Sequence, residues 1–154
     1  MRRLLVLLTL IAAGSAAASE QDAKLSRLAW SAFECHELAL IADNQPEKVR
    51  LFRLGSDAST KFSEAVRAGK VSDIEMFNFV PGGMVDIVRS TDAPSAEFVV
   101  GRIYQLVVVT TFEWVTQKDS GGKALPPDKW VVDPLEMKGI AQTKYRQANC
   151  ELIK

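Results

Sequence analysis

Residues 46–68, PEKVRLFRLGSDASTKFSEAVRA, carry the clearest helical pattern in the chain. Apolar and small residues recur every three or four positions and form one face of a helix, whereas charged residues occupy the other face. Pro46 suits the first helical position, where its missing N–H group costs no hydrogen bond. Gly69 can end the helix in a left-handed conformation. Gly55 lies on the apolar face, so we expect another helix to approach closely there.

Helical patterns flank this segment on both sides. An apolar stripe predicts a helix from Ala23 to Ala42. Ser72 and Glu75 form a capping box, which predicts a short helix that ends before Pro81-Gly82-Gly83. Residues 84–88 fit either a further short helix or an extended connection, and the glycine pair itself is interpreted as a turn.

The segment Phe98–Val115 is ambiguous. Its Val and Thr content favours a strand, but its apolar residues recur at helical spacing and the segment is long for a strand. Asp92-Ala93-Pro94 also resembles a helix entrance, so we interpret the segment as a central helix. A second apolar face predicts either complete burial or contact with another subunit. That face consists of Phe98, Val108, Val109 and Phe112.

A last helix is announced by Asp133, Pro134 and Glu136, which together form an N-terminal capping signal. If this helix ran on to Cys150, the cysteine would point away from the apolar stripe. An end near Asn149 would redirect it, because Asn tolerates the left-handed conformation. The fold class is therefore all-α, a compact bundle of four to five helices.

The first 18 residues have the pattern of a cleavable secretory signal peptide. A short basic region with Arg2 and Arg3 precedes about ten apolar residues, and Ala16-Ala17-Ala18 supplies the small side chains of a cleavage site. The apolar run is shorter than the roughly 20 residues of a transmembrane anchor. We therefore expect cleavage after Ala18, a single helical domain over residues 19–154, and periplasmic localisation without a membrane anchor.

Charge and cysteine content bear on the partners of the protein and on its compartment. The leader contains two of the 19 basic residues and none of the 19 acidic ones, so the mature chain would carry a formal charge of −2. This mixed, weakly acidic composition lacks the basic footprint of a nucleic-acid-binding protein. Cys35 and Cys150 lie near the two ends of the domain, and in an oxidising compartment they most simply form one disulfide. Free thiols or an intermolecular bond are the alternatives.

The sequence contains no pattern typical of a catalytic or metal site. His36 is the only histidine, and its position in an apolar stripe predicts a packed histidine with a hydrogen-bond partner. Adjacent helix positions do not face one another, so Cys35-His36-Glu37 does not form a catalytic cluster. We expect no enzyme activity, cofactor or metal, although a hydrolase that uses His36 stays a third hypothesis.

The loop from Lys118 to Val132 holds the candidate partner-binding residues. Its prolines make it stiff, and its aromatic residue is of the type enriched at binding hot spots. These residues are Lys123, Asp128, Lys129 and Trp130. The alternative is that Trp130 folds back to cover the core.

Four groups of residues together resemble a family of uncharacterised proteobacterial secreted helical proteins. They are Trp30…Phe33…Cys35, Leu51-Phe52…Gly55…Phe62, Pro94-Ser95…Phe98…Gly101-Arg102-Ile103 and Ala141…Tyr145…Asn149-Cys150. Their general plan is similar to that of periplasmic immunity proteins against type VI secretion amidase effectors. The resemblance implies a helical, disulfide-bonded dimer that blocks a peptidoglycan amidase by occupying its active-site cleft. No inhibitory motif matches residue by residue, so no binding residue carries over.

Taken together, these features predict a periplasmic, non-enzymatic binding protein that acts as an inhibitor or immunity protein for a cell-wall hydrolase of the amidase type. The alternative is a structural or envelope-maintenance homodimer joined through the Phe98–Val115 segment.

Overall fold

The computed structural model describes residues 2–90 and 94–154, with side chains from residue 19 onward. Within these ranges the chain forms six α-helices and two short 3-10 helices and no strand, which confirms the all-α prediction. The α-helices are α1 (Arg2–Ile41), α2 (Gln45–Arg67), α3 (Asp73–Phe79), α4 (Gly82–Arg89), α5 (Ala96–Thr116) and α6 (Pro134–Gln147). The 3-10 helices are η1 (Pro127–Lys129) and η2 (Cys150–Leu152).

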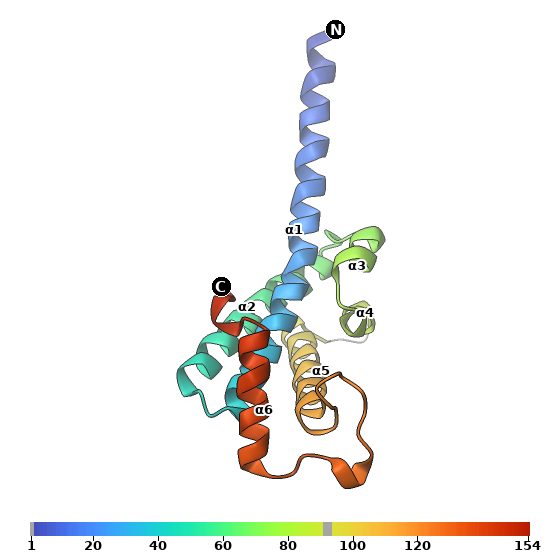
Figure 1. The fold of residues 1–154 in the computed structure, drawn as a ribbon. Coiled ribbons are helices and arrows are strands. Elements are labelled where there is room, and N and C mark those ends of the chain that lie inside the picture. The colour runs from blue at the N-terminus through green and yellow to red at the C-terminus, as the bar shows by residue number, and fades with distance from the viewer. Residues whose placement is uncertain (1, 91–93) are drawn as a thin grey trace.

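Helix α1 is longer than the sequence pattern predicted. It begins at Arg2 instead of near Ala23 and continues without a break to Ile41. Leu and Ala, which dominate residues 4–18, are strong helix formers, so the segment expected to be a leader continues the helix. Figure 1 shows this first part projecting away from the other helices, while the second part of α1 runs through the middle of the bundle.

Helices α1 and α2 form the most extensive helix pair, and Gly55 allows their close approach. A Cβ atom on Gly55 would lie 2.6 Å from Cδ1 of Phe33, a residue that is completely buried. The expectation from the apolar face of residues 46–68 is therefore confirmed, and Phe33 is the partner. Gly69 ends α2 with a φ of 68°, as predicted, and the amide of Lys70 donates to the carbonyl of Ala65.

Helix α3 packs against α1, and α4 packs against α5. The capping box of Ser72 and Glu75 is present at the start of α3. The interpretation of Gly82-Gly83 as a turn was wrong, because both glycines lie in the first turn of α4. A Cβ on Gly83 would lie 3.1 Å from Cδ2 of Leu106, so the small residue lets α4 pack closely on α5.

Helix α5 confirms the helical interpretation of the ambiguous segment. Ser95 caps it through a hydrogen bond from the amide of Phe98, whereas Asp92 and Ala93 of the predicted entrance lie outside the described residues. Val99, Ile103 and Val107 enter the core. By length and composition α5 could also cross a membrane, a property that it shares with the core helices of soluble proteins.

A disulfide joins α1 to the C-terminal end of the chain. Cys35 and Cys150 are bonded and almost completely buried, with 5.5 Å between their Cα atoms, which confirms the predicted pairing. Asn149 adopts a φ of 53°, so α6 ends there and Cys150 turns inward, as the sequence suggested. Arg50 of α2 donates to the carbonyls of Cys150 and Ile153 and holds the segment in place.

We predict that Gly55→Ala destabilises the protein. The added methyl group displaces the buried Phe33 ring at a cost of about 1–3 kcal/mol, which exceeds the roughly 1 kcal/mol that Ala gains over Gly in a helix. Urea unfolding should show a lower midpoint. Gly101→Ala is the matched control, because the added methyl group would meet no other side chain within 4 Å, and it should raise the midpoint. Equal stabilisation by both substitutions would contradict the packing role.

Candidate functional site

The loop between α5 and α6, residues 117–133, is held in place by backbone hydrogen bonds. The amide of Leu125 donates to the carbonyl of Gln117 over 2.7 Å, and the amide of Val131 donates to the carbonyl of Thr116 over 2.8 Å. At the tip, Oδ1 of Asp119 accepts hydrogen bonds of 2.9 Å from the amides of Gly121 and Lys123. These bonds give a long irregular segment a defined shape, which we call the α5–α6 loop.

All four predicted partner-binding residues lie exposed on this loop. They are Lys123, Asp128, Lys129 and Trp130. The indole N–H of Trp130 donates to the carbonyl of Leu125 over 3.1 Å, while 41% of the residue stays exposed. Trp130 therefore packs back on its own loop and still presents a face to solvent. Trp130 is not among the residues packed on the described core clusters, and its role in partner binding stays a prediction.

Two further apolar residues beside Trp130 were missed by the sequence analysis. Val132 is 81% exposed and Leu135, in the first turn of α6, is 80% exposed. The sequence signal was present, because four of the six residues 130–135 are large and apolar. Isolated exposed apolar residues are ordinary, whereas several of them close together in the sequence make a segment a candidate interaction surface. We refer to Trp130, Val132 and Leu135 as the loop patch.

A groove of about 770 Å³ separates the α5–α6 loop from α6. On the loop side it is lined by Lys118, Asp119 and Lys129, among others, and on the α6 side by Glu136, Ile140 and Lys144. Of the four predicted residues only Lys129 lines the groove; Trp130 is not among its lining residues. The groove therefore combines apolar lining residues with side chains of both charges. Such a lining suits a peptide segment better than a small inorganic ion.

Lys144 is the unusual residue of this groove. It is only 7% exposed, and its Nζ atom lies 3.5 Å from the centre of the Trp114 ring. Burial lowers the pKa of the Lys144 ammonium group, and the charge of Glu34 on α1 acts in the opposite direction. The stacking on an indole face supplies part of the stabilisation that water would otherwise give. No sequence pattern predicted this contact, since α5 and α6 meet only in the fold.

His36 lies in the core and not at a surface site. It is 6% exposed, its Nδ1 atom lies 2.9 Å from the carbonyl oxygen of Lys48, and its Nε2 atom lies 3.1 Å from the hydroxyl of Tyr104. Because a carbonyl only accepts, Nδ1 carries the proton and Nε2 accepts from Tyr104. The rings of Phe52 and Tyr104 flank the imidazole. The interpretation as a packed, hydrogen-bonded histidine is confirmed.

The next residue, Glu37, is buried as well. It is 5% exposed, and its Oε2 atom has no hydrogen-bond partner within the described part of the chain. Burial raises the pKa of this carboxyl group above its ordinary value. Neither His36 nor Glu37 lines the groove beside the α5–α6 loop, so these two titratable groups do not belong to that surface.

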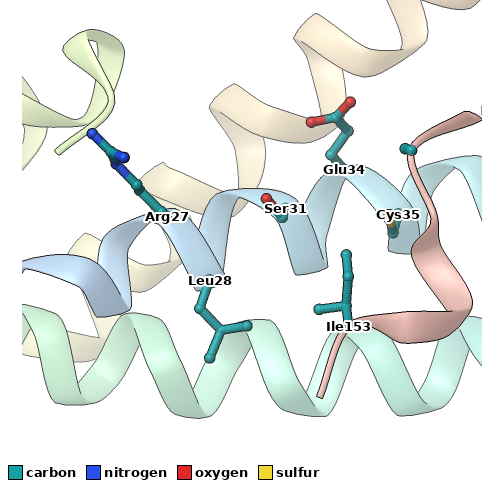
Figure 2. A pocket seen from close by; sticks show the side chains of 7 residues that line it. Arg27, Leu28, Ser31, Glu34, Cys35 and Ile153 are labelled. Carbon is teal, nitrogen blue, oxygen red and sulfur yellow. The ribbon is translucent and has the colours of Figure 1, made fainter. Parts of the chain in front are cut away.

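A smaller hollow of about 330 Å³ lies beside the disulfide (Figure 2). Its lining includes Arg27, Glu34 and Cys35, but these side chains do not converge. Figure 2 shows Arg27 reaching away from the hollow toward α3, where it donates to the carbonyls at the end of that helix. Glu34 points in another direction, and the sulfur of Cys35 is bonded in the disulfide. The arrangement brings no reactive groups together.

Among the residues with described side chains, no three His, Cys, Asp or Glu residues are grouped so as to hold a metal ion. Comparison of the chain with protein-family models, curated proteins and solved structures finds no match. The candidate site therefore rests on the geometry of the α5–α6 loop, its patch and its groove.

We predict that His36 titrates below its ordinary pKa of 6.5, because burial disfavours the imidazolium form. The free energy of unfolding should then fall as the pH drops from about 6.5 to the folded-state pKa, since the unfolded chain binds the proton more readily. As the only histidine, its ring proton resonance can be followed by NMR from pH 4 to 8. The urea-unfolded chain is the control, and equal pKa values in both states would refute the effect.

Proposed function

We propose that this chain is an exported periplasmic binding protein without catalytic activity, which inhibits a cell-wall hydrolase of the peptidoglycan amidase type in the manner of an immunity protein. The observation that carries the proposal is the loop patch of Trp130, Val132 and Leu135, displayed on a loop whose backbone is already hydrogen-bonded. Figure 1 shows this loop extending beyond the end of the helical bundle. A projecting loop is the shape that fits into the cleft of another protein.

Preorganisation supports a binding role for the α5–α6 loop. A loop that is already ordered loses less conformational entropy when it binds, so more of the contact energy appears as affinity. Trp is also among the residues that dominate binding energies at interfaces. The indole of Trp130 is fixed by its hydrogen bond to Leu125 but retains an exposed face. It can therefore act as a rigid anchor, with Val132 and Leu135 enlarging the apolar contact.

The groove adds polar selectivity to this apolar contact. Its loop side carries Lys118, Asp119 and Lys129, and its α6 side carries Glu136 and Lys144. Both sides therefore present both signs of charge, and a partner segment with complementary charges would be preferred. The buried disulfide supports the periplasmic location, because such bonds persist in oxidising compartments.

Inhibition of purified peptidoglycan amidases of the bacterial toxin class tests the proposal, with the clearing of a peptidoglycan suspension as the readout. We expect the protein to inhibit at least one member of the panel. Leu135→Ala and Trp130→Ala should each weaken inhibition at least tenfold, about 1.4 kcal/mol, because each removes an anchor side chain. Leu135 gives the clearer test, because its side chain is 80% exposed, whereas Trp130 also holds the loop through its hydrogen bond to Leu125.

Phe77→Ala is the matched control for this experiment. Phe77 is 88% exposed on α3 and does not belong to the loop patch, so its removal should leave inhibition unchanged. Failure to inhibit any amidase, or equal losses from Phe77→Ala and Leu135→Ala, would overturn the proposal.

A second candidate function is a structural homodimer joined through α5. It is favoured by the exposure of Phe98, Val109 and Phe112, which are 49%, 41% and 42% exposed on the outer face of that helix. Sedimentation equilibrium would then show a dimer that Val109→Asp dissociates. A monomer at all concentrations would eliminate this candidate.

A further inference from the structure

The part of α1 that follows the expected leader contacts α3 at both of its ends. At the start of α3, the hydroxyl of Ser19 donates to the carboxylate of Glu75 and lies within hydrogen-bonding reach of the carbonyl of Lys70. One and two turns further along, α1 carries Lys24 and Arg27. Both cations lie over the ring of Phe79, at the other end of α3. The segment that directly follows residue 18 is therefore part of the folded domain and not a linker.

The sequence at this point has the signature of a helix start. Ser19-Glu20-Gln21-Asp22 has the spacing of a capping box, with a hydroxyl residue at the N-cap and a carboxylate three positions later. Acidic residues are favoured in the first turn of a helix, where they face its positive end. In the full chain these residues lie inside the uninterrupted helix α1, where neither preference applies. Ser19, Glu20 and Asp22 therefore suit a helix that begins at Ser19.

We propose that the mature chain begins at Ser19 and that its new α-ammonium group docks on Glu75, so that removal of the leader adds an ion pair between α1 and α3. This inference rests on the export that the proposed function includes. The cleavage is a hydrolysis by signal peptidase. Water adds its hydroxyl to the carbonyl of Ala18 and a hydrogen to the nitrogen of Ser19, and the resulting amine is protonated at neutral pH.

The charges around Ser19 suit an ammonium group. A positive terminus at the start of a helix is normally unfavourable, because the first turn of the helix is itself positive. Here two carboxylates compensate for it: Asp22 on the same helix can reach back as in a capping box, and Glu75 approaches from α3. Glu75 already contacts the residue that becomes the terminus.

The other charged groups nearby are engaged elsewhere or exposed. Glu20 is paired with Lys24 on α1 itself. Asp73, on α3, is paired with Arg89 of α4 over 2.6 Å. Lys70, in the connection before α3, offers its carbonyl to Ser19 while its side chain is exposed. The carboxylate that faces the terminus from α3 is therefore that of Glu75.

The experiment uses protein exported with its own leader and purified from the periplasm. Mass spectrometry should give a chain that starts at Ser19. Urea unfolding is then measured between pH 7 and 10 for the wild type and for Glu75→Gln. The carboxylate raises the pKa of the folded ammonium group above the roughly 7.7–8.0 of the unfolded chain. Its stabilisation is thus complete below pH 8 and disappears as the pH rises through the folded-state pKa.

The wild type should lose more stability than Glu75→Gln over this range, and the difference between them should shrink with rising pH to a constant value near pH 10, since the carboxylate of Glu75 still favours the first turn of α3. Gln retains the capping box with Ser72, so the variant keeps the start of α3. Asp73→Asn removes the same charge from the same helix. Its stability should change with pH as that of the wild type does. Lys and Tyr groups that titrate in this range are present in all three proteins, so they do not affect the comparison.

The same experiment contains the outcomes that overturn the inference. A retained leader, a different first residue, or parallel pH profiles for wild type and Glu75→Gln would each do so. No partner protein is involved, so a chain that starts at Ser19 and shows the ion pair but inhibits no amidase overturns only the proposed function.

Discussion

The contact of Phe33 with the backbone of Gly55 sets the distance between α1 and α2, and the rest of the bundle depends on it. The Phe33 ring occupies the space where any other residue at position 55 would place its Cβ atom. On its other side the ring meets Tyr104 of α5 edge-on, with 5.2 Å between the centroids. One buried aromatic residue thus positions two helices against α1, and such close-packed sites tolerate little change in volume.

Tyr104 also links the helices through a hydrogen bond. Its hydroxyl meets Nε2 of His36, whose Nδ1 reaches the carbonyl of Lys48 on α2, so a polar chain links α5, α1 and α2. One residue before His36, the disulfide of Cys35 joins α1 to Cys150 and fixes the C-terminal end of α6. The disulfide thus anchors α6 at the end opposite the α5–α6 loop, and the loop itself is held by its hydrogen bonds to the end of α5.

The proposed binding role of the α5–α6 loop depends on the order of its backbone. Its backbone bonds to the end of α5 hold the segment that carries Trp130, while Leu135, five residues further along, is exposed in the first turn of α6. The groove behind the loop contains Lys144, whose charge is kept against the Trp114 ring instead of in water. None of the three loop-patch residues lines the groove, but Lys129, Val131 and Glu136, their neighbours in the sequence, do.

Much of the helical framework followed from the sequence alone because helix signals are local: the periodicity of residues 46–68, the capping box at Ser72 and the left-handed Asn149 each involve neighbours in the chain. The pairing of Cys35 with Cys150 followed because only two cysteines exist. Only the tertiary structure decided that Phe33 is the partner of Gly55, and that Lys144 is buried on Trp114 while Leu135 is exposed. Those outcomes depend on which helix faces meet, and residues far apart in the sequence carry no local signal of their contact.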